Sequence, residues 1–172
     1  MGNHIKTGSI IMGKKAINKN GTIKVYEGVP KVLYASNGTH LNAQAMSNAE
    51  LRAAGLFDVV LPEGYNSAIH DLSEIFFDSA NIVYTYTKSD KTWDATFEEM
   101  KASKISNLKA SAHSKLAQTD WYILRALNGG TAVPDSILAE RQSILDAVIT
   151  KENEINALLE KAEVVLYNIN ID

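Results

Sequence analysis

The stretch Gln118–Arg141, QTDWYILRALNGGTAVPDSILAER, separates two long helical patterns in the second half of the chain. Thr119-Asp120 is suited to capping a new turn after a helix, and Gly129-Gly130 allows the chain to leave that turn. Pro134 favours the first turn of the following helix. With Trp121 packed into the groove between the two helices, the stretch predicts an anchored helix-to-helix corner.

Two side chains of this stretch also suit a binding surface. Arg125 is expected to reach the carbonyl groups at the helix end or an acidic partner, Asp120 or Glu140. Trp121 and Arg125 belong to the residue types that are enriched in the hot spots of protein interfaces. The residues favour the corner, and a protein-binding surface at the same place is the alternative.

Apolar periodicity on both sides of the stretch predicts a helical hairpin. A helix over residues 94–118 has no Gly or Pro and carries one apolar stripe: Phe97, Met100, Ile105, Leu108, Ala112 and Leu116. A helix over residues 135–166 carries a heptad seam, which Arg141 and Lys151 interrupt. The seam consists of Ile137, Ile144, Val148, Ile155, Leu158, Ala162 and Val165. It packs against the first helix in the simplest structure, and pairing with another subunit or protein is the alternative.

The first half of the chain shows short β-rich runs between turn residues. The runs over residues 23–27 and 31–35 flank Gly28-Val29-Pro30 and predict a pair of strands joined by a tight turn. Asn20-Gly21 and Asn37-Gly38 predict further chain reversals, because Asn-Gly readily adopts positive φ.

A capping box at Ser47–Glu50 predicts a short helix over residues 48–54, which ends at Gly55. The apolar run over residues 57–61 predicts a strand. A further strand is expected over residues 80–87, with one face formed by Ile82, Tyr84 and Tyr86.

These elements predict an α+β protein with a β-rich domain over residues 1–90 and a helical hairpin over residues 91–172. The chain has 172 residues, of which 45% are hydrophobic and 22% charged, and this is enough for one or two compact cores. Because Cys is absent, disulfides and thiolate chemistry are excluded.

The charge and hydropathy of the chain exclude two classes of partner. Lys and Arg number 17 against 20 Asp and Glu, and the net charge of −3 gives no strong field for nucleic acid. No apolar run approaches the roughly 20 residues that span a bilayer. We therefore expect neither a nucleic acid nor a membrane as a partner, and a soluble, unsecreted chain.

No motif in the sequence specifies a reaction. The four histidines, His4, His40, His70 and His113, lack metal-ligand spacing. His70 and Asp71 are adjacent, so their side chains point apart on a strand or helix. Phosphate-binding and serine-hydrolase motifs are absent. We expect no catalytic residue, cofactor, metal or small-molecule substrate, and a small hydrolase would need His70, Asp71 and another acid in one cleft.

Residues of the corner together resemble the C-terminal region of tailed-bacteriophage proteins of the tail fibre assembly and tail-chaperone type. The matching residues are Leu116, Thr119-Asp120-Trp121, Arg125, Gly130, Val133-Pro134, Arg141 and Ile144. In that family a helix ends in a T/S-D-W element, an arginine and a glycine turn lead to a proline, and an arginine-bearing helix follows. The resemblance covers Trp93 to Ala162, and residues 47–60 are similar to a short element of phage tail proteins.

The resemblance implies a non-enzymatic phage protein that acts by binding other tail or fibre proteins. It would be a tail, collar or fibre-linking subunit of the virion, and the strand-rich first half favours this role. The alternative is a tail fibre assembly chaperone, present in the host cytoplasm during assembly and not retained in the particle. The corner residues Asp120, Trp121, Arg125 and Arg141 are the expected architectural or interaction residues. A second copy is a further candidate partner, and a cellular interaction module would fit the same physics.

Overall fold

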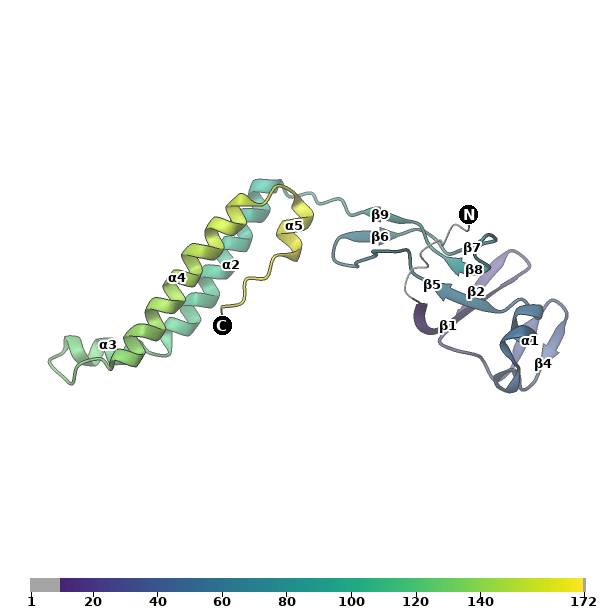
Figure 1. Ribbon diagram of the computed structural model, residues 1–172, viewed down its shortest axis with the longest axis horizontal. Helices are drawn as coiled ribbons and strands as arrows, with labels where there is room; N and C mark the ends of the chain where they lie inside the picture. The colour runs from purple at the N-terminus through teal and green to yellow at the C-terminus, as the bar shows by residue number, and fades with distance from the viewer. Residues whose placement is uncertain (1–9, 172) are drawn as a thin grey trace, which may run out of the picture. The chain divides into compact units, whose positions relative to one another are not determined.

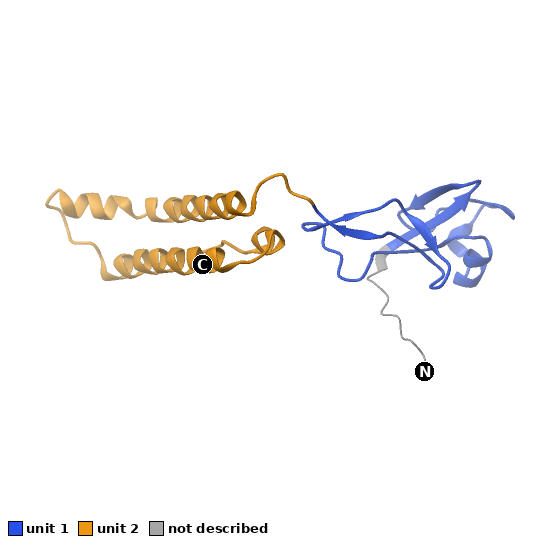
Figure 2. Ribbon diagram, turned by 90° about the horizontal axis from the view of Figure 1, so that it is seen from above, with its two compact units in different colours: residues 1–91 blue, residues 92–172 orange. Residues whose placement is uncertain are grey.

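The computed structural model describes residues 10–171 and confirms the α+β class. The chain forms two compact units, residues 1–91 and 92–172, which Figure 2 draws in different colours. The first unit is rich in strands, and the second consists of helices and connecting segments. Each unit has its own clusters of buried apolar side chains.

The main sheet of the first unit has five strands in the order β2-β1-β5-β8-β7. Its strands are β1 (Ile10–Lys19), β2 (Thr22–Tyr26), β5 (Phe57–Val60), β7 (Phe76–Asp78) and β8 (Val83–Thr85). Neighbouring strands are antiparallel except β5 and β8, which run parallel. The interior of the sheet buries Ala16, Val59 and Tyr84, one residue from each of its three central strands.

The predicted pairing of residues 23–27 with residues 31–35 is wrong. β2 pairs with β1 across Asn20-Gly21, whose φ values of 54° and 86° suit a two-residue hairpin turn. β3 (Leu33–Ala35) pairs instead with β4 (Gly38–His40). The Asn20-Gly21 turn joins the strands that flank it, whereas Ser36-Asn37 connects β3 to β4, because Gly38 already pairs with Ala35. The segment between β2 and β3 is left without a ladder.

The capping box of the short helix α1 (Asn48–Ala53) is confirmed. The N–H of Glu50 donates to the Ser47 hydroxyl at 3.3 Å, and the Ser47 N–H donates to the Glu50 carboxylate at 2.7 Å. The Ser47 hydroxyl, and secondly the Ser47 N–H, donate to the Glu50 carboxylate and hold the pKa of Glu50 below its usual value. A single 3-10 turn, η1 (Ala43–Ala45), precedes the helix, and Gly55 at φ 84° follows it. The predicted strand over residues 57–61 is confirmed as β5.

The strand predicted over residues 80–87 is shorter than expected. Ile82 has a φ of 57°, in the left-handed region, so the regular strand β8 begins only at Val83. The carboxylate of Asp78 accepts two backbone N–H groups of this turn and fixes its shape. Ile82 is consequently exposed whereas Tyr84 is buried, and the predicted common face does not extend to Ile82. A separate antiparallel pair joins β6 (His70–Leu72) to β9 (Lys88–Asp90).

The second unit is a helical hairpin with a short helix at each end of its second arm (Figure 1). Its helices are α2 (Phe97–Ala117), α3 (Asp120–Leu127), α4 (Asp135–Ala157) and α5 (Lys161–Leu166). A capping box between Thr96 and Glu99 starts α2, three residues later than predicted. The packing of α2 on α4 is confirmed, with Leu108, Ala112, Ile144 and Ile155 buried between them.

The predicted continuous helix over residues 135–166 is wrong. Leu158 adopts an extended conformation, with φ −62° and ψ 146°, and a new capping box between Glu160 and Glu163 starts α5. Residues 158–171, which we call the C-terminal strap, fold back onto α2 and α4. Val164 and Ile171 of the strap are buried, and Tyr167 and Ile169 pack against the cluster that contains Ile171.

Candidate functional site at the tip of the hairpin

Arg141 of α4 holds the joint between α2 and α3. Its Nη1 donates to the carbonyl of Leu116 at 2.7 Å and to the hydroxyl of Thr119 at 2.7 Å. The same nitrogen lies 2.9 Å from the carboxylate of Asp120 at the start of α3. A cation at the carbonyl end of α2 and an anion in the first turn of α3 both complement the helix dipoles. The predicted architectural roles of Asp120 and Arg141 therefore have a definite geometry.

The helix α3 exposes its apolar side chains. None of its residues is buried, and Trp121, Leu124 and Leu127 are 51%, 59% and 77% exposed. We call these three residues the tip face. The predicted burial of Trp121 between the long helices is therefore wrong. The residues after Thr119 form a helix of their own, and the ring lies on its solvent side.

Arg125 is placed by aromatic contacts and not by the expected acidic partner. Its guanidinium carbon lies 4.7 Å from the ring centre of Trp121 and 5.4 Å from that of Tyr122. The two rings are themselves 3.9 Å apart. Among the described residues Arg125 forms no ion pair with Asp120 or Glu140, and the carbonyl-capping role belongs to Arg141. Stacking of this kind fixes both the arginine and the tryptophan in place.

Gly130 closes the tip by allowing a close approach. Its N–H donates to the carbonyl of Arg125 at 3.0 Å, and a Cβ at this position would lie 2.8 Å from that same oxygen. Gly129 precedes it with a φ of 77°, in the left-handed region that favours glycine. Both glycines are thus required by the backbone path, as the sequence predicts for the exit from the corner.

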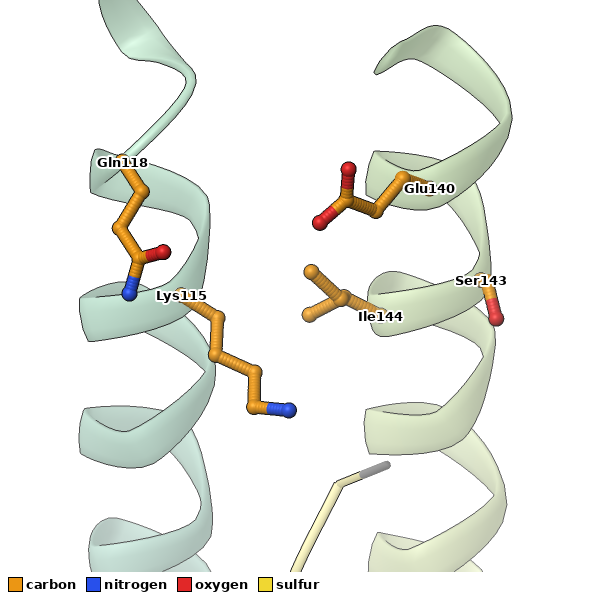
Figure 3. Close-up of a pocket in the computed structure, with 5 residues that line it drawn as sticks. All are labelled: Lys115, Gln118, Glu140, Ser143 and Ile144. Carbon is orange, nitrogen blue, oxygen red and sulfur yellow. The ribbon is translucent and has the colours of Figure 1, made fainter. Parts of the chain in front are cut away.

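A groove of about 410 Å³ lies between α2 and α4 next to the joint (Figure 3). It is lined by Lys115, Gln118, Glu140, Ser143 and Ile144. The Lys115 ammonium donates to the backbone carbonyl of Ile171, at the end of the strap. The lining includes one carboxylate and no histidine, whereas acid–base work by paired carboxylates needs two. The groove offers polar contacts and an apolar floor.

His70 and Asp71 are neighbours on β6, and the structure does not bring their side chains together. The Nδ1 of His70 accepts the N–H of Asn66 at 3.0 Å, and its Nε2 lies 3.5 Å from the carboxylate of Asp90 on the paired strand. Asp71 is exposed and, as the next residue on β6, points to the other face. His4 lies outside the described residues. The contacts of His70 fix a turn and a strand pair.

Within residues 10–171, no group of three or more His, Cys, Asp or Glu side chains is placed to hold a metal ion. No helix in the same range is long and apolar enough to cross a membrane. Comparisons of the chain with protein-family models, curated proteins and solved structures found no match. The tip of the hairpin, with its exposed apolar face and its fixed arginine, is therefore the candidate functional site.

Proposed function

We propose that the chain is a non-enzymatic component of a bacteriophage tail, and that its tip face binds another tail or fibre protein. The observation that carries the proposal is the exposure of Trp121, Leu124 and Leu127 beside a stacked arginine. Apolar side chains that bury nothing in their own fold gain free energy when a partner covers them. Tryptophan and arginine are also the residue types most enriched in interface hot spots.

The geometry of the joint supports the phage assignment indirectly. The residues that carry the resemblance to tail proteins include Thr119, Asp120, Gly130 and Arg141, and these residues make the contacts that orient α3. If proteins of that family bind their partners through this corner, the shared residues would serve to hold α3 in its orientation. The assignment to a phage tail rests on that pattern.

A lasting role in the particle is favoured over a transient chaperone role. The β-rich unit has a core of its own and exposes several large side chains, among them Tyr34, Leu41 and Phe76. A protein that links two components needs two binding units, whereas a transient chaperone needs only one.

Quantitative mass spectrometry of purified virions of the phage that encodes the chain tests the role. We expect the protein at a constant number of copies per particle. Its absence from particles, together with its presence in infected cells, would overturn the structural role and favour the assembly chaperone.

The tip face is tested in the same phage with the double variant Trp121→Ala/Leu124→Ala. We expect the variant protein to fold but to be lost from particles, because the apolar contacts are removed while the joint is intact. The matched control is Leu145→Ala/Ile149→Ala, which removes two exposed apolar side chains of α4 that lie outside the tip face. Equal incorporation of the double variant and the wild-type chain would contradict binding through the tip face.

A further inference from the structure

The break between α4 and α5 falls in a segment whose residues favour a helix. The segment Leu158-Leu159-Glu160 contains only strong helix formers, and no Gly or Pro occurs between Asp135 and the end of the chain. Leu158 nevertheless has a ψ of 146°, which ends α4. Leu159 is 83% exposed at the bend, so its apolar side chain gains nothing there. The bend is held by the N–H groups of Leu159 and Glu160, which donate to the Glu163 carboxylate, together with the contacts of the strap on the long helices.

The apolar seam of α4 continues across the bend. Leu158, Ala162 and Val165 follow Ile155 at the spacing of three and four residues that defines the seam. A straight helix over residues 135–166 would consequently keep one apolar stripe along its whole length. Two conformations of residues 158–160 thus compete, one bent by the hydrogen bonds to Glu163 and the contacts of the strap, and one straight by local preference.

The contacts that hold the strap lie on α2 and α4, and any copy of these helices can supply them. Lys104 Nζ of α2 donates to the carbonyl of Val165 at 3.1 Å, and Lys151 Nζ of α4 donates to that of Asn168 at 3.1 Å. Lys161 of the strap donates to the carbonyl of Ala95 at 2.6 Å. The first two are hydrogen bonds from lysine side chains to the backbone of the strap, and they depend on the path of the strap only.

We propose that two copies of the chain exchange their C-terminal straps, with residues 158–160 as the hinge. In the exchanged dimer α4 and α5 form one straight helix, and the strap of each copy lies on α2 and α4 of the other. The contacts of the strap with the long helices are kept, because the same groups meet between chains, and the hydrogen bonds from Leu159 and Glu160 to Glu163 are exchanged for helical ones. The straight hinge adds helical hydrogen bonds, and exchange of an identical element is a low-cost route to a dimer.

The second copy is the favoured occupant because the groove is built for this strap. Ile171 belongs to the apolar cluster that includes Leu108 and Ile155, and Val164 of the same strap is buried as well. Lysines from both long helices match the carbonyls of its backbone. A different protein would have to reproduce both sets of contacts, whereas a second copy carries them already.

Refolding of the full chain at increasing concentration, followed by size-exclusion chromatography with light scattering, tests the exchange. A mixture of ¹⁴N and ¹⁵N chains is refolded together and treated with an amine-reactive cross-linker. We expect a dimer that grows with concentration, in which Lys104–Lys161 cross-links join chains of different isotope. A monomer at every concentration would overturn the proposal. A dimer with this cross-link only within single chains would overturn it equally.

The hinge is tested with Lys161→Pro and its matched control Lys161→Ala. Lys161 is the first residue of α5, where proline is tolerated, and Glu160 before it is already extended, with ψ 149°. In the straight helix the same proline is internal, once in each of the two hinges of the dimer, and we expect the dimerisation constant to fall by roughly ten-thousandfold. Both variants lose the lysine contacts, so Lys161→Ala should dimerise about as the wild type does. Equal dimer formation by the two variants would contradict the hinge, and circular dichroism of each monomer checks that it is folded.

Discussion

The two ends of α4 carry short helices with opposite relations to the rest of the chain. The helix α3, which precedes α4, is held by polar contacts at its first residues and buries none of its own side chains. The strap, which follows α4, buries Val164 and Ile171 and receives hydrogen bonds from lysines of both long helices. Polar contacts therefore fix the position of the tip, but its apolar side chains are exposed. The strap, in contrast, packs and forms hydrogen bonds within the unit.

This difference separates stability from binding within one hairpin. Burial of apolar area is the main favourable term in folding, so the strap end should carry most of the stability of the helical unit. The tip can change its exposed side chains with little effect on folding. Such substitutions should lower the affinity for a partner, so their effect appears only when a partner is present.

The largest expected effect breaks the apolar cluster under the strap. Ile155 is fully buried in that cluster, and Ile155→Ala should lower the free energy of unfolding by about 2–5 kcal/mol. Trp121→Ala at the tip should cost about 1 kcal/mol or less, because half of the ring stays in water. Denaturant unfolding of both variants, followed by far-UV circular dichroism, measures the contrast. Equal losses would show that the tip is part of the folding core.

The next effect concerns the backbone path of the tip. Gly130→Ala would place a Cβ 2.8 Å from the carbonyl oxygen of Arg125, and we expect a loss of about 1–3 kcal/mol. Gly129→Ala is the companion variant, since its site is spacious and only the φ of 77° opposes it, at a cost of about 1 kcal/mol. Thermal unfolding ranks the two. A smaller loss for Gly130→Ala than for Gly129→Ala would argue that the close approach is relaxed in solution.

Sequence patterns predicted the elements that local chemistry determines. The capping box at Ser47–Glu50, the stripe of α2 and the seam of α4 up to Ile155 are all present. The Asn20-Gly21 turn also has the predicted positive φ at both residues, whereas Asn37 does not adopt positive φ and Gly38 is already part of β4. Such features need no knowledge of distant parts of the chain.

Contacts between distant residues decided the parts that the sequence did not predict. The helix break at Leu158 depends on a strap that returns to α2, and periodicity alone favours a straight helix there. At the tip, the joint residues Asp120 and Arg141 were identified, but the orientation of Trp121 was not. Composition cannot distinguish a tryptophan that anchors a corner from one that a short helix turns toward solvent.

A smaller effect is expected from the ion pair at the joint. The side chains of Asp120 and Arg141 are 47% and 21% exposed, so solvent screens their attraction. A double-mutant cycle of Asp120→Ala and Arg141→Ala should give a coupling energy of about 0.2–1 kcal/mol. Arg141→Ala alone should cost more than Asp120→Ala, because Arg141 also donates to Leu116 and Thr119. A coupling near zero, with unequal single losses, would leave the carbonyl cap as the sole role of Arg141.

The smallest effect is a titration that reports the attachment of the strap. Burial, and secondly the hydrogen bond from its hydroxyl to the carboxylate of Glu154, raise the pKa of Tyr167 from 10.0 to about 12. Because the folded-state pKa is raised, the neutral phenol stabilises the docked strap. That contribution is complete below pH 10.0 and is lost as the pH rises toward about 12.

The difference in ultraviolet absorbance between the wild-type chain and Tyr167→Phe isolates this one phenol. We expect a midpoint near 12 for Tyr167, with the strap detaching in the same interval. The variant Glu154→Gln removes the charge but keeps a hydrogen-bond acceptor, and should lower the midpoint only in part, because burial remains the first cause. A midpoint at the ordinary value of 10.0 in the folded wild-type chain would mean that Tyr167 is solvated and that the strap end is not docked. The strap would then resemble the tip, because its end would also be exposed to solvent.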